Sequence, residues 1–485
     1  MNHQLIRRIL LRVIEVECLF MVFPAFTALL YREFYEMSVY LGIGGAVYLI
    51  CHVVSKFIKV ADPKIFYAKE GFVTVAFSWI LLGAVGALPF FVTREIPNYI
   101  DALFETVSGF TTTGSTILLD VEAMSHASLL WRSFTHWVGG MGVLVFILAI
   151  QPLSGNYDMH IMRAESPGYS AQKLSPRMRD SASALYLIYL IMTFLLIILL
   201  CLEGMPVFDS VCHAFGTAGT GGFGIKGDSI ESYSVICKIT ITVFMLLFGV
   251  NFNFYYLMVT GKLKDAFRIE EVRWYLIIYL AATAFVTIDI IKNGIYTNAG
   301  KAILDSSFQT ASIMTTTGFS TADFCLWPGF SQAILVVLMF IGACTGSTGG
   351  GIKVSRILAG FKLIRNETEL SLHPQRIKPL YLEGRKMNER TTNTLKVYMT
   401  AFIFIFTLSV LIVSMDDFDL VTSFTAVAAT INNIGPGLSL VGPAGNFSGF
   451  SYLSKLVLIF DMLAGRLEIF PMLVIFTRKV WRRGA

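Results

Sequence analysis

The stretch Asp101-Ala-Leu-Phe-Glu-Thr-Val-Ser-Gly-Phe-Thr-Thr-Thr-Gly114-Ser115 decides the fold that we predict for this chain. Three more stretches of the same kind follow it, from Asp209 to Gly221, from Asp305 to Gly318 and from Asp419 to Gly435. Each begins near an Asp, which is a good helix N-cap, and continues with about ten helix-compatible residues, too few to span a bilayer. Each ends in a cluster of Gly with Thr or Asn. A recurrence at intervals of roughly 100 residues indicates a repeated unit.

The composition indicates that the solvent of this chain is a lipid bilayer. Of its 485 residues, 15% are charged and 55% are hydrophobic. Soluble domains have about 25% charged residues, so this chain lacks the charge that a soluble surface needs. The composition excludes a soluble globular protein and argues against nucleic acid as a partner. The seven cysteines are scattered and form no CxxC pair, so neither a disulfide framework nor a zinc site is indicated.

Ten stretches have the length of about 20 mostly apolar residues that a membrane-spanning helix needs. They are Val13–Leu30, Val39–Phe57, Gly71–Val92, Ser128–Gln151, Ala184–Leu202, Val235–Val259, Tyr275–Ile291, Ala333–Leu358, Leu395–Ser414 and Tyr452–Phe476. With ten spans, both termini lie on the same side of the membrane. Most of the 38 basic residues then fall on that side, and the positive-inside rule makes it cytoplasmic. We therefore expect a multi-pass protein of the cell membrane, surrounded by lipid, with both termini in the cytoplasm.

The repeated unit predicts the domain organisation. Each unit contains a helix, a short re-entrant helix, a Gly-containing loop and a second helix. We expect a two-helix membrane hairpin at residues 1–68, and four units at residues 69–160, 161–263, 264–366 and 367–485, the last including a cytoplasmic tail. Irregular backbone at membrane depth is tolerated only where it is buried in protein or lines water. Four such loops, all entering from outside, therefore predict an all-α membrane protein with four repeats around a pseudo-fourfold pore.

The residue types in the four loops favour a monovalent cation. Gly permits a positive φ, so that successive carbonyl groups can point into a pore, and a ring of carbonyls can replace the hydration shell of a cation. A short helix that ends at the pore directs the negative end of its dipole toward the ion. The alternative for one loop is an ordinary extracellular turn, but four loops in register argue against it.

Two further features indicate a gate. The segment Gly342–Gly351 has five Gly in ten positions, which would cost about 4–5 kcal/mol in a continuous helix. We expect a break there, with a flexible loop beneath the filter; close helix packing through small residues is the alternative. Arg466 falls within the last span, and its helical neighbours Met462, Leu463, Ile469 and Phe470 are apolar. It must reach another helix, loop carbonyls or pore water, or else snorkel to the inner interface.

The chain resembles the TrkH/KtrB/HKT superfamily of potassium transporters. The resemblance is carried by the four Gly-containing loops, by Trp131-Arg-Ser-Phe-Thr-His-Trp-Val-Gly-Gly-Met-Gly142, by Gly346-Ser-Thr-Gly-Gly-Gly-Ile-Lys353 and by Arg466. Two extra N-terminal spans are typical of the TrkH branch. The second loop departs from the family pattern, because Gly219 stands where a bulkier residue is expected. In the fourth loop, Asn432 and Asn433 replace Thr.

The resemblance implies potassium uptake without a covalently bound cofactor, potassium being the substrate. It implies a homodimer and a cytoplasmic, nucleotide-binding, TrkA-like regulatory subunit. The cation-binding residues of the filter would be Thr112, Thr113, Gly114, Gly219, Thr220, Gly221, Thr316, Thr317, Gly318, Asn432, Asn433, Ile434 and Gly435. The gate would consist of Gly346, Ser347, Thr348, Gly349, Gly350, Gly351 and Arg466.

Two other functions are weighed against potassium uptake. One is a sodium-coupled or sodium-permeable transporter of the Ktr or HKT kind. The other is a polytopic membrane enzyme, which would need titratable groups that converge at membrane depth, and the sequence offers only a sparse set. The run Gly219-Thr-Gly-Gly-Phe-Gly224 matches the pattern GxGxxG, but no strand or βαβ unit surrounds it, so it is not a nucleotide site. No HExxH, Walker A or GxSxG motif occurs, so we expect no enzyme.

Overall fold

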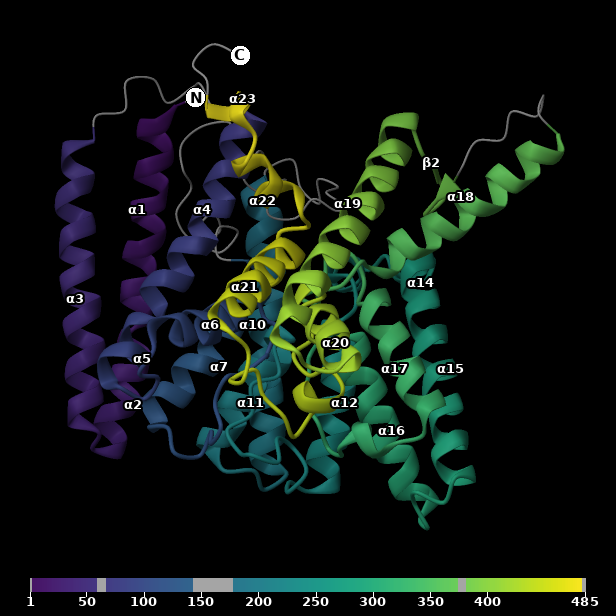
Figure 1. Cartoon of the computed structure of the whole chain (residues 1–485), viewed down its shortest axis with the longest axis horizontal. Helices are drawn as coiled ribbons and strands as arrows, with labels where there is room; N and C mark the ends of the chain where they lie inside the picture. The colour runs from purple at the N-terminus through teal and green to yellow at the C-terminus, as the bar shows by residue number, and fades with distance from the viewer. Residues whose placement is uncertain (1, 59–66, 143–177, 374–380, 482–485) are drawn as a thin grey trace.

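The computed structural model describes residues 2–58, 67–142, 178–373 and 381–481, which are almost entirely helical (Figure 1). The first half contains α1 (His3–Phe20), α2 (Val22–Tyr31), α3 (Phe34–Phe57), α4 (Ala68–Gly86), α5 (Leu88–Thr93), α6 (Tyr99–Phe110), α7 (His126–Gly140), α10 (Met178–Leu202), α11 (Val207–Gly219), α12 (Val235–Phe248), α13 (Phe252–Val259) and α14 (Leu263–Phe267). The second half contains α15 (Glu270–Lys292), α16 (Ala299–Met314), α17 (Gly329–Ile341), α18 (Val354–Leu372), α19 (Glu389–Val413), α20 (Leu420–Ile431), α21 (Tyr452–Arg466), α22 (Phe470–Ile475) and α23 (Arg478–Trp481).

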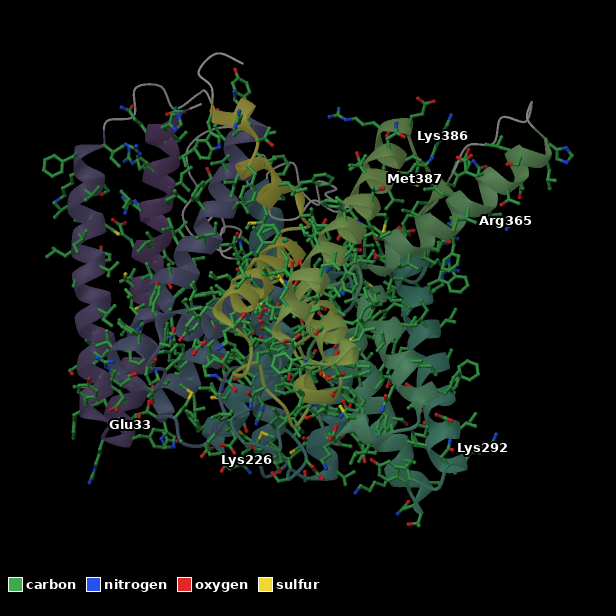
Figure 2. All side chains as sticks on the ribbon, in the orientation of Figure 1. Glu33, Lys226, Lys292, Arg365, Lys386 and Met387 are labelled. Atoms are coloured by element: carbon green, nitrogen blue, oxygen red, sulfur yellow. The ribbon has the colours of Figure 1, made fainter. Side chains whose placement is uncertain are left out.

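The remaining elements are short. Single 3-10 turns occur at Phe324–Leu326, Ser414–Asp416 and Ser439–Val441. One antiparallel hairpin joins β1 (Tyr381–Leu382) to β2 (Arg385–Lys386), with Tyr381 opposite Lys386. The start of α1, α23, β2 and α18 all lie toward the upper edge of Figure 1, and we call this side the terminal end. Figure 2 shows Lys386 and Met387 at the terminal end, whereas Glu33, Lys226 and Lys292 lie at the opposite end, which we call the loop end.

Within the described residues, six helices or joined helix pairs are long and apolar enough to cross a membrane, and a seventh if the bent pair α12 and α13 is one span. Two further predicted spans are therefore not continuous helices. The predicted span Val235–Val259 bends by 89° after Phe248, and Tyr452–Phe476 is interrupted after Arg466. The predicted span Ser128–Gln151 corresponds to α7, which ends at Gly140; residues 143–151 lie outside the described residues.

The break predicted in Ala333–Leu358 is present, because α17 ends at Ile341 and α18 begins only at Val354. The second helix of each predicted unit is short. These helices, α7, α12, α17 and α21, each end after 13–15 residues, well short of a full span. A helix of this length rises about 20 Å, against a hydrocarbon core of about 30 Å.

Four short helices, α6, α11, α16 and α20, organise the packing. Each contacts the long helix before it and the helix after it, as α6 contacts α4 and α7. The helix after each one also packs against the short helix of the next group, with α7 on α11, α12 on α16, α17 on α20 and α21 on α6. A long helix, a short helix and the helix after it form one group, and these contacts arrange the four groups in a circle. The first and last groups are therefore neighbours.

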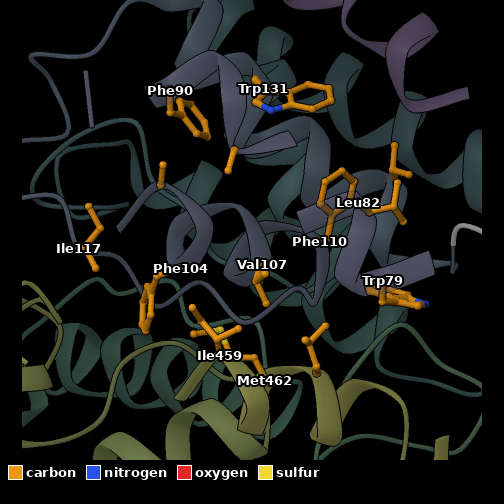
Figure 3. Packing of buried hydrophobic residues seen from close by; sticks show 14 of the residues in the cluster. Trp79, Leu82, Phe90, Phe104, Val107, Phe110, Ile117, Trp131, Ile459 and Met462 are labelled. Atoms are coloured by element: carbon orange, nitrogen blue, oxygen red, sulfur yellow. The ribbon is translucent and has the colours of Figure 1, made fainter. Parts of the chain in front are cut away.

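Buried apolar side chains hold the first and last groups of helices together. In Figure 3, Phe104 and Val107 of α6 lie close to Ile459 and Met462 of α21. Trp79 and Leu82 of α4 and Phe110 of α6 belong to the same buried cluster. All of these side chains are buried. The small residues of α4 bring its backbone close to α6, because a Cβ added at Gly83 would overlap the side chain of Val107. Apolar burial and close packing therefore hold α6 in a position that it could not keep alone.

Candidate functional site

Each of the four short helices ends in the same backbone motif. The first residue of the turn has a positive φ although it is not glycine: 54° at Thr112, 53° at Thr220, 59° at Thr316 and 55° at Asn433. The next amide bonds the carbonyl five residues earlier, over 2.9 Å from Thr113 to Ser108 and over 2.8 Å from Thr317 to Ser312. This is a Schellman motif with a non-glycine residue in the left-handed position. Such a residue costs of order 1 kcal/mol, which surrounding packing must offset.

Two residues after each left-handed residue stands a glycine, also with a positive φ. These glycines are Gly114, Gly222, Gly318 and Gly435. A Cβ added to any of them would lie under 3.0 Å from a carbonyl oxygen of the next loop: Gly221 for Gly114, Thr317 for Gly222, Ile434 for Gly318 and Thr113 for Gly435. The last contact returns to the first loop, so the four loops form a closed ring of backbone. Only glycine satisfies both the dihedral angle and the close approach.

The second loop needs a correction of its register. The sequence prediction aligned Gly221 with Gly114, but the structure aligns Gly222 with it, and Gly221 with Thr113. Gly219 is the last residue of α11 rather than a loop residue. In the other three loops the predicted glycines Gly114, Gly318 and Gly435 do occupy the ring position.

His136 of α7 explains why the second loop is rich in glycine. A Cβ added at Gly221 would overlap the imidazole of His136, and one added at Gly219 would overlap its backbone carbonyl. The ring nitrogen Nδ1 lies 2.7 Å from the carbonyl oxygen of Gly109, and the amide of Phe223 donates to Nε2 over 3.2 Å. His136 is completely buried and joins the first and second loops. Within the run Trp131–Gly142, this histidine therefore supports the backbone of the ring.

The predicted Asp N-caps are correct only for the fourth short helix. Asp419 caps α20 and accepts a hydrogen bond from the Thr422 amide over 3.0 Å. Asp101 and Asp209 lie inside the first turns of α6 and α11, and Asp305 lies in the middle of α16. Their carboxylates have other partners, since Asp101 pairs with Lys455 at 2.6 Å and Asp305 accepts from Thr321 at 3.0 Å.

Toward the loop end, the ring opens into a cavity. All four ring glycines line it, together with Ser115, Phe223, Pro436, Arg132 and Lys226 among others. Arg132 is buried, and its guanidinium pairs with Glu105 of α6 at 2.8 Å. The same arginine donates to the carbonyl of Gly224 over 3.2 Å. This ion pair therefore fixes the backbone that follows the second loop to the first short helix, a role that sequence reasoning missed.

On the other side of the ring lies the Gly-rich segment between α17 and α18. The amide of Gly350 donates to Thr316 Oγ1 over 2.6 Å. A Cβ added at Gly350 would overlap the carbonyl of Asn432, and one at Gly349 would overlap that of Thr315. The segment thus touches the third and fourth loops directly, on the face where their helices end. Gly350 and Thr348 are buried, whereas Gly346 is exposed.

The Gly-rich segment also fills the bend between α12 and α13. Cys344 donates to the carbonyl of Gly249 over 3.0 Å, and Phe252 donates to that of Gly346 over 3.0 Å. The hydroxyl of Thr348 donates to the carbonyl of Phe248 over 3.2 Å. These bonds satisfy backbone groups that the broken helix leaves open. Asn251, which lies inside the predicted span Val235–Val259, caps α13.

Arg466 is the last residue of α21 and reaches inward rather than toward the membrane surface. Its guanidinium donates to the carbonyl of Thr348 over 2.8 Å and to that of Gly140 over 2.7 Å, and it also bonds the carbonyl of Gly139. Gly139 and Gly140 form the end of α7, where the helix dipole is negative. Arg466 and the Gly-rich segment together touch all four groups of helices on this side of the ring.

Comparison with known proteins identifies the family. Residues 42–483 match the TrkH family profile, which describes a cation transport protein. The chain is 38% identical over 420 residues to the Trk system potassium uptake protein TrkH of Salmonella typhimurium, covering 86% of each chain. It is 31% identical to the TrkH of Halomonas elongata over the whole of both chains. The crystal structure of the potassium transporter TrkH from Vibrio parahaemolyticus has a TM-score of 0.89 and 32% identity, and the match covers 99% of this chain and 100% of that one. The chain therefore belongs to the TrkH family of cation transport proteins.

Proposed function

We propose that this protein carries potassium ions across the cell membrane through the ring of four loops. The observation that supports this most strongly is the closed order of the ring, in which each left-handed glycine abuts a carbonyl of the next loop. Carbonyl oxygens arranged around one axis can replace the water shell of a potassium ion. The four short helices end at the ring, so their negative dipole ends favour a cation there.

The filter that we propose consists of the residues aligned by their backbone. They are Thr112, Thr113 and Gly114; Thr220, Gly221 and Gly222; Thr316, Thr317 and Gly318; and Asn433, Ile434 and Gly435. Relatives at 31–38% identity are named potassium uptake proteins, which favours potassium over sodium as the substrate. The cavity at the loop end would be the entrance, on the outer side of the membrane, with both termini in the cytoplasm.

The same proposal assigns the gate. The Gly-rich segment blocks the inner side of the ring, and Arg466 places a positive charge beneath it, held by carbonyls of α7 and of the segment. A cation leaving the ring would meet this charge. In this proposal, a cytoplasmic, nucleotide-binding, TrkA-like subunit controls the opening of the gate. Two copies of the chain form a homodimer.

Uptake into liposomes tests the proposal. Purified protein is reconstituted and the uptake of rubidium, as a potassium substitute, is compared with that of sodium, in the presence and absence of the cytoplasmic subunit. We expect rubidium uptake that exceeds sodium uptake and that the subunit changes. Equal uptake of both ions would favour a sodium-permeable transporter, and no uptake above empty liposomes would contradict transport by this ring.

A further inference from the structure

Glu271 binds the backbone on both sides of residues 346–351, the predicted gate. It is the second residue of α15, and its side chain is buried. One carboxylate oxygen, Oε1, accepts the amide of Thr345 over 2.7 Å and the amide of Ser355 over 3.1 Å. Thr345 directly precedes Gly346, and Ser355 lies four residues after Gly351, so these two amides flank residues 346–351, the predicted gate. The hydroxyls of Thr345 and Ser355 also bond each other. A single carboxylate thus closes the base of the loop.

The same contact caps a helix. The N-cap residue of α18 is Lys353, whose side chain makes no capping bond. Ser355 lies in the first turn of α18, where amides have no partner within the helix. Glu271 supplies that partner from a different helix, and its charge complements the positive end of the α18 dipole. If Glu271 moved, the loop and the start of α18 would both lose an anchor.

A second glutamate does the same for α15. The N-cap residue of α15 is Ile269, which offers no side-chain acceptor. Glu383 lies in the turn of the β1–β2 hairpin, with φ of 51°. Its Oε2 accepts the amide of Glu270 over 2.9 Å, and its Oε1 accepts the amide of Glu271 over 2.9 Å. The hairpin therefore holds the residue that in turn holds the loop.

The hairpin is placed where a partner can reach it. Tyr381, Glu383 and Lys386 are exposed, while Leu382 between them is buried. Figure 2 shows Lys386 at the terminal end. Lys362 of α18 joins the two parts, since its Nζ donates to Glu270 over 2.7 Å and to the carbonyl of Tyr381 over 3.2 Å. The contacts thus run from an exposed hairpin, through the start of α15, to the segment beneath the ring.

We propose that Glu383 and Glu271 act in series as positioning residues, so that a displacement of the β1–β2 hairpin releases the Gly-rich segment. This inference rests on the proposed function for its effect on ion flow, but not for its effect on the position of the loop. When the hairpin moves, α15 loses its cap, the carboxylate of Glu271 shifts, and Thr345 and Ser355 lose their common acceptor.

The experiment measures the loop and the ion separately. Full-length protein carrying Ser347→Cys is reconstituted, and the labelling rate of that cysteine by a thiol reagent is read by peptide-resolved mass spectrometry, beside rubidium uptake. Glu271→Ala, Glu383→Ala and the double variant are compared with Glu389→Ala, an exposed acid in the first turn of α19. Glu271→Gln, which keeps an acceptor oxygen, serves if Glu271→Ala fails to fold.

We expect each single variant to raise the labelling rate and the rubidium uptake at least about fivefold, because a charge-assisted cap is lost. The double variant should exceed the stronger single variant by less than about twofold, since the residues act in series. Unchanged labelling in Glu383→Ala, or effects that multiply in the double variant, would overturn the inference. A faster labelling rate with unchanged rubidium uptake would support the series but contradict the proposed gate.

Discussion

The ring and the region beneath it differ in symmetry. In the ring, four loops share one left-handed turn, one hydrogen-bond pattern and one glycine position. Beneath it, the four helices end in four ways: α7 stops at Gly140, α12 bends into α13, α17 gives way to the Gly-rich segment and α21 ends at Arg466. A site that coordinates one ion needs several similar ligands, whereas a closure needs one movable part. The difference supports our proposal that the ring selects the ion and that the Gly-rich segment and Arg466 control its passage.

The largest effect is expected from an added methyl group in the ring. In Gly318→Ala, the Cβ would overlap the carbonyl of Ile434 while φ stays near 88°. We predict the loss of more than about nine-tenths of rubidium uptake, because the carbonyls can no longer face the ion. The matched control is Gly329→Ala at the start of α17, where an added Cβ has open space. Equal uptake by the two variants would contradict the role of the ring.

Removing the charge beneath the ring should increase rubidium uptake rather than decrease it. Arg466→Ala removes a cation that carbonyls of Thr348 and Gly140 hold in place. We predict that rubidium uptake without the cytoplasmic subunit rises at least about tenfold, since a unit charge near the path contributes more than about 1.4 kcal/mol to the barrier. Arg466→Lys, which keeps the charge but not the fork, should rise less. Arg365→Ala, on the exposed face of α18, serves as the control, and a rise as large there would contradict this account.

A smaller effect is expected where the ring is least regular. His136→Ala leaves the carbonyl of Gly109 and the amide of Phe223 without a buried partner, which costs about 1–3 kcal/mol for each group. We predict that the ratio of rubidium to sodium uptake falls about fivefold, because the second loop is no longer supported. His126→Ala changes the half-exposed histidine at the other end of α7. Selectivity that stays at the wild-type ratio in His136→Ala would show that the support is only structural.

The smallest effect concerns the cap of the fourth short helix. Hydrogen bonds from Thr422 lower the pKa of Asp419 below its ordinary value. A carboxyl whose pKa is lower in the folded state stabilises the protein above the unfolded pKa of about 3.9, and this contribution is lost as the pH falls through the folded pKa. Asp419→Ala should therefore cost about 1 kcal/mol at pH 7 and less at pH 3, as read from thermal unfolding in detergent. The exposed Glu231→Ala is the control; an unchanged cost at pH 3 would contradict the assignment.

The sequence was sufficient to locate three of the four ring glycines, but not the second. The second loop offers three candidates, Gly219, Gly221 and Gly222. Only the backbone dihedral angles and the position of His136 distinguish them. The repeat also revealed the four short helices, yet three of their Asp residues proved not to be N-caps. Asn98 and Asn298 cap two of these helices instead, and both precede the predicted Asp by several residues.

Long-range contacts explain what the sequence could not reveal. The breaks at Phe248 and Arg466 have no local glycine signal as clear as Gly342–Gly351. At Phe248, the open backbone groups are satisfied by the Gly-rich segment, which lies far away in the sequence. The partners of Arg466 lie more than 100 residues before it. No sequence motif reveals the capping glutamates Glu271 and Glu383, because each caps a helix that lies elsewhere in the chain.

The ratio of rubidium to sodium uptake in liposomes that contain wild-type protein or Gly318→Ala tests the central claim most directly. The ring of carbonyls predicts that wild-type protein takes up rubidium in clear preference to sodium, and that the added methyl group abolishes this uptake while Gly329→Ala retains it. Preference for rubidium that survives in folded Gly318→Ala would contradict the claim that these four loops select the ion.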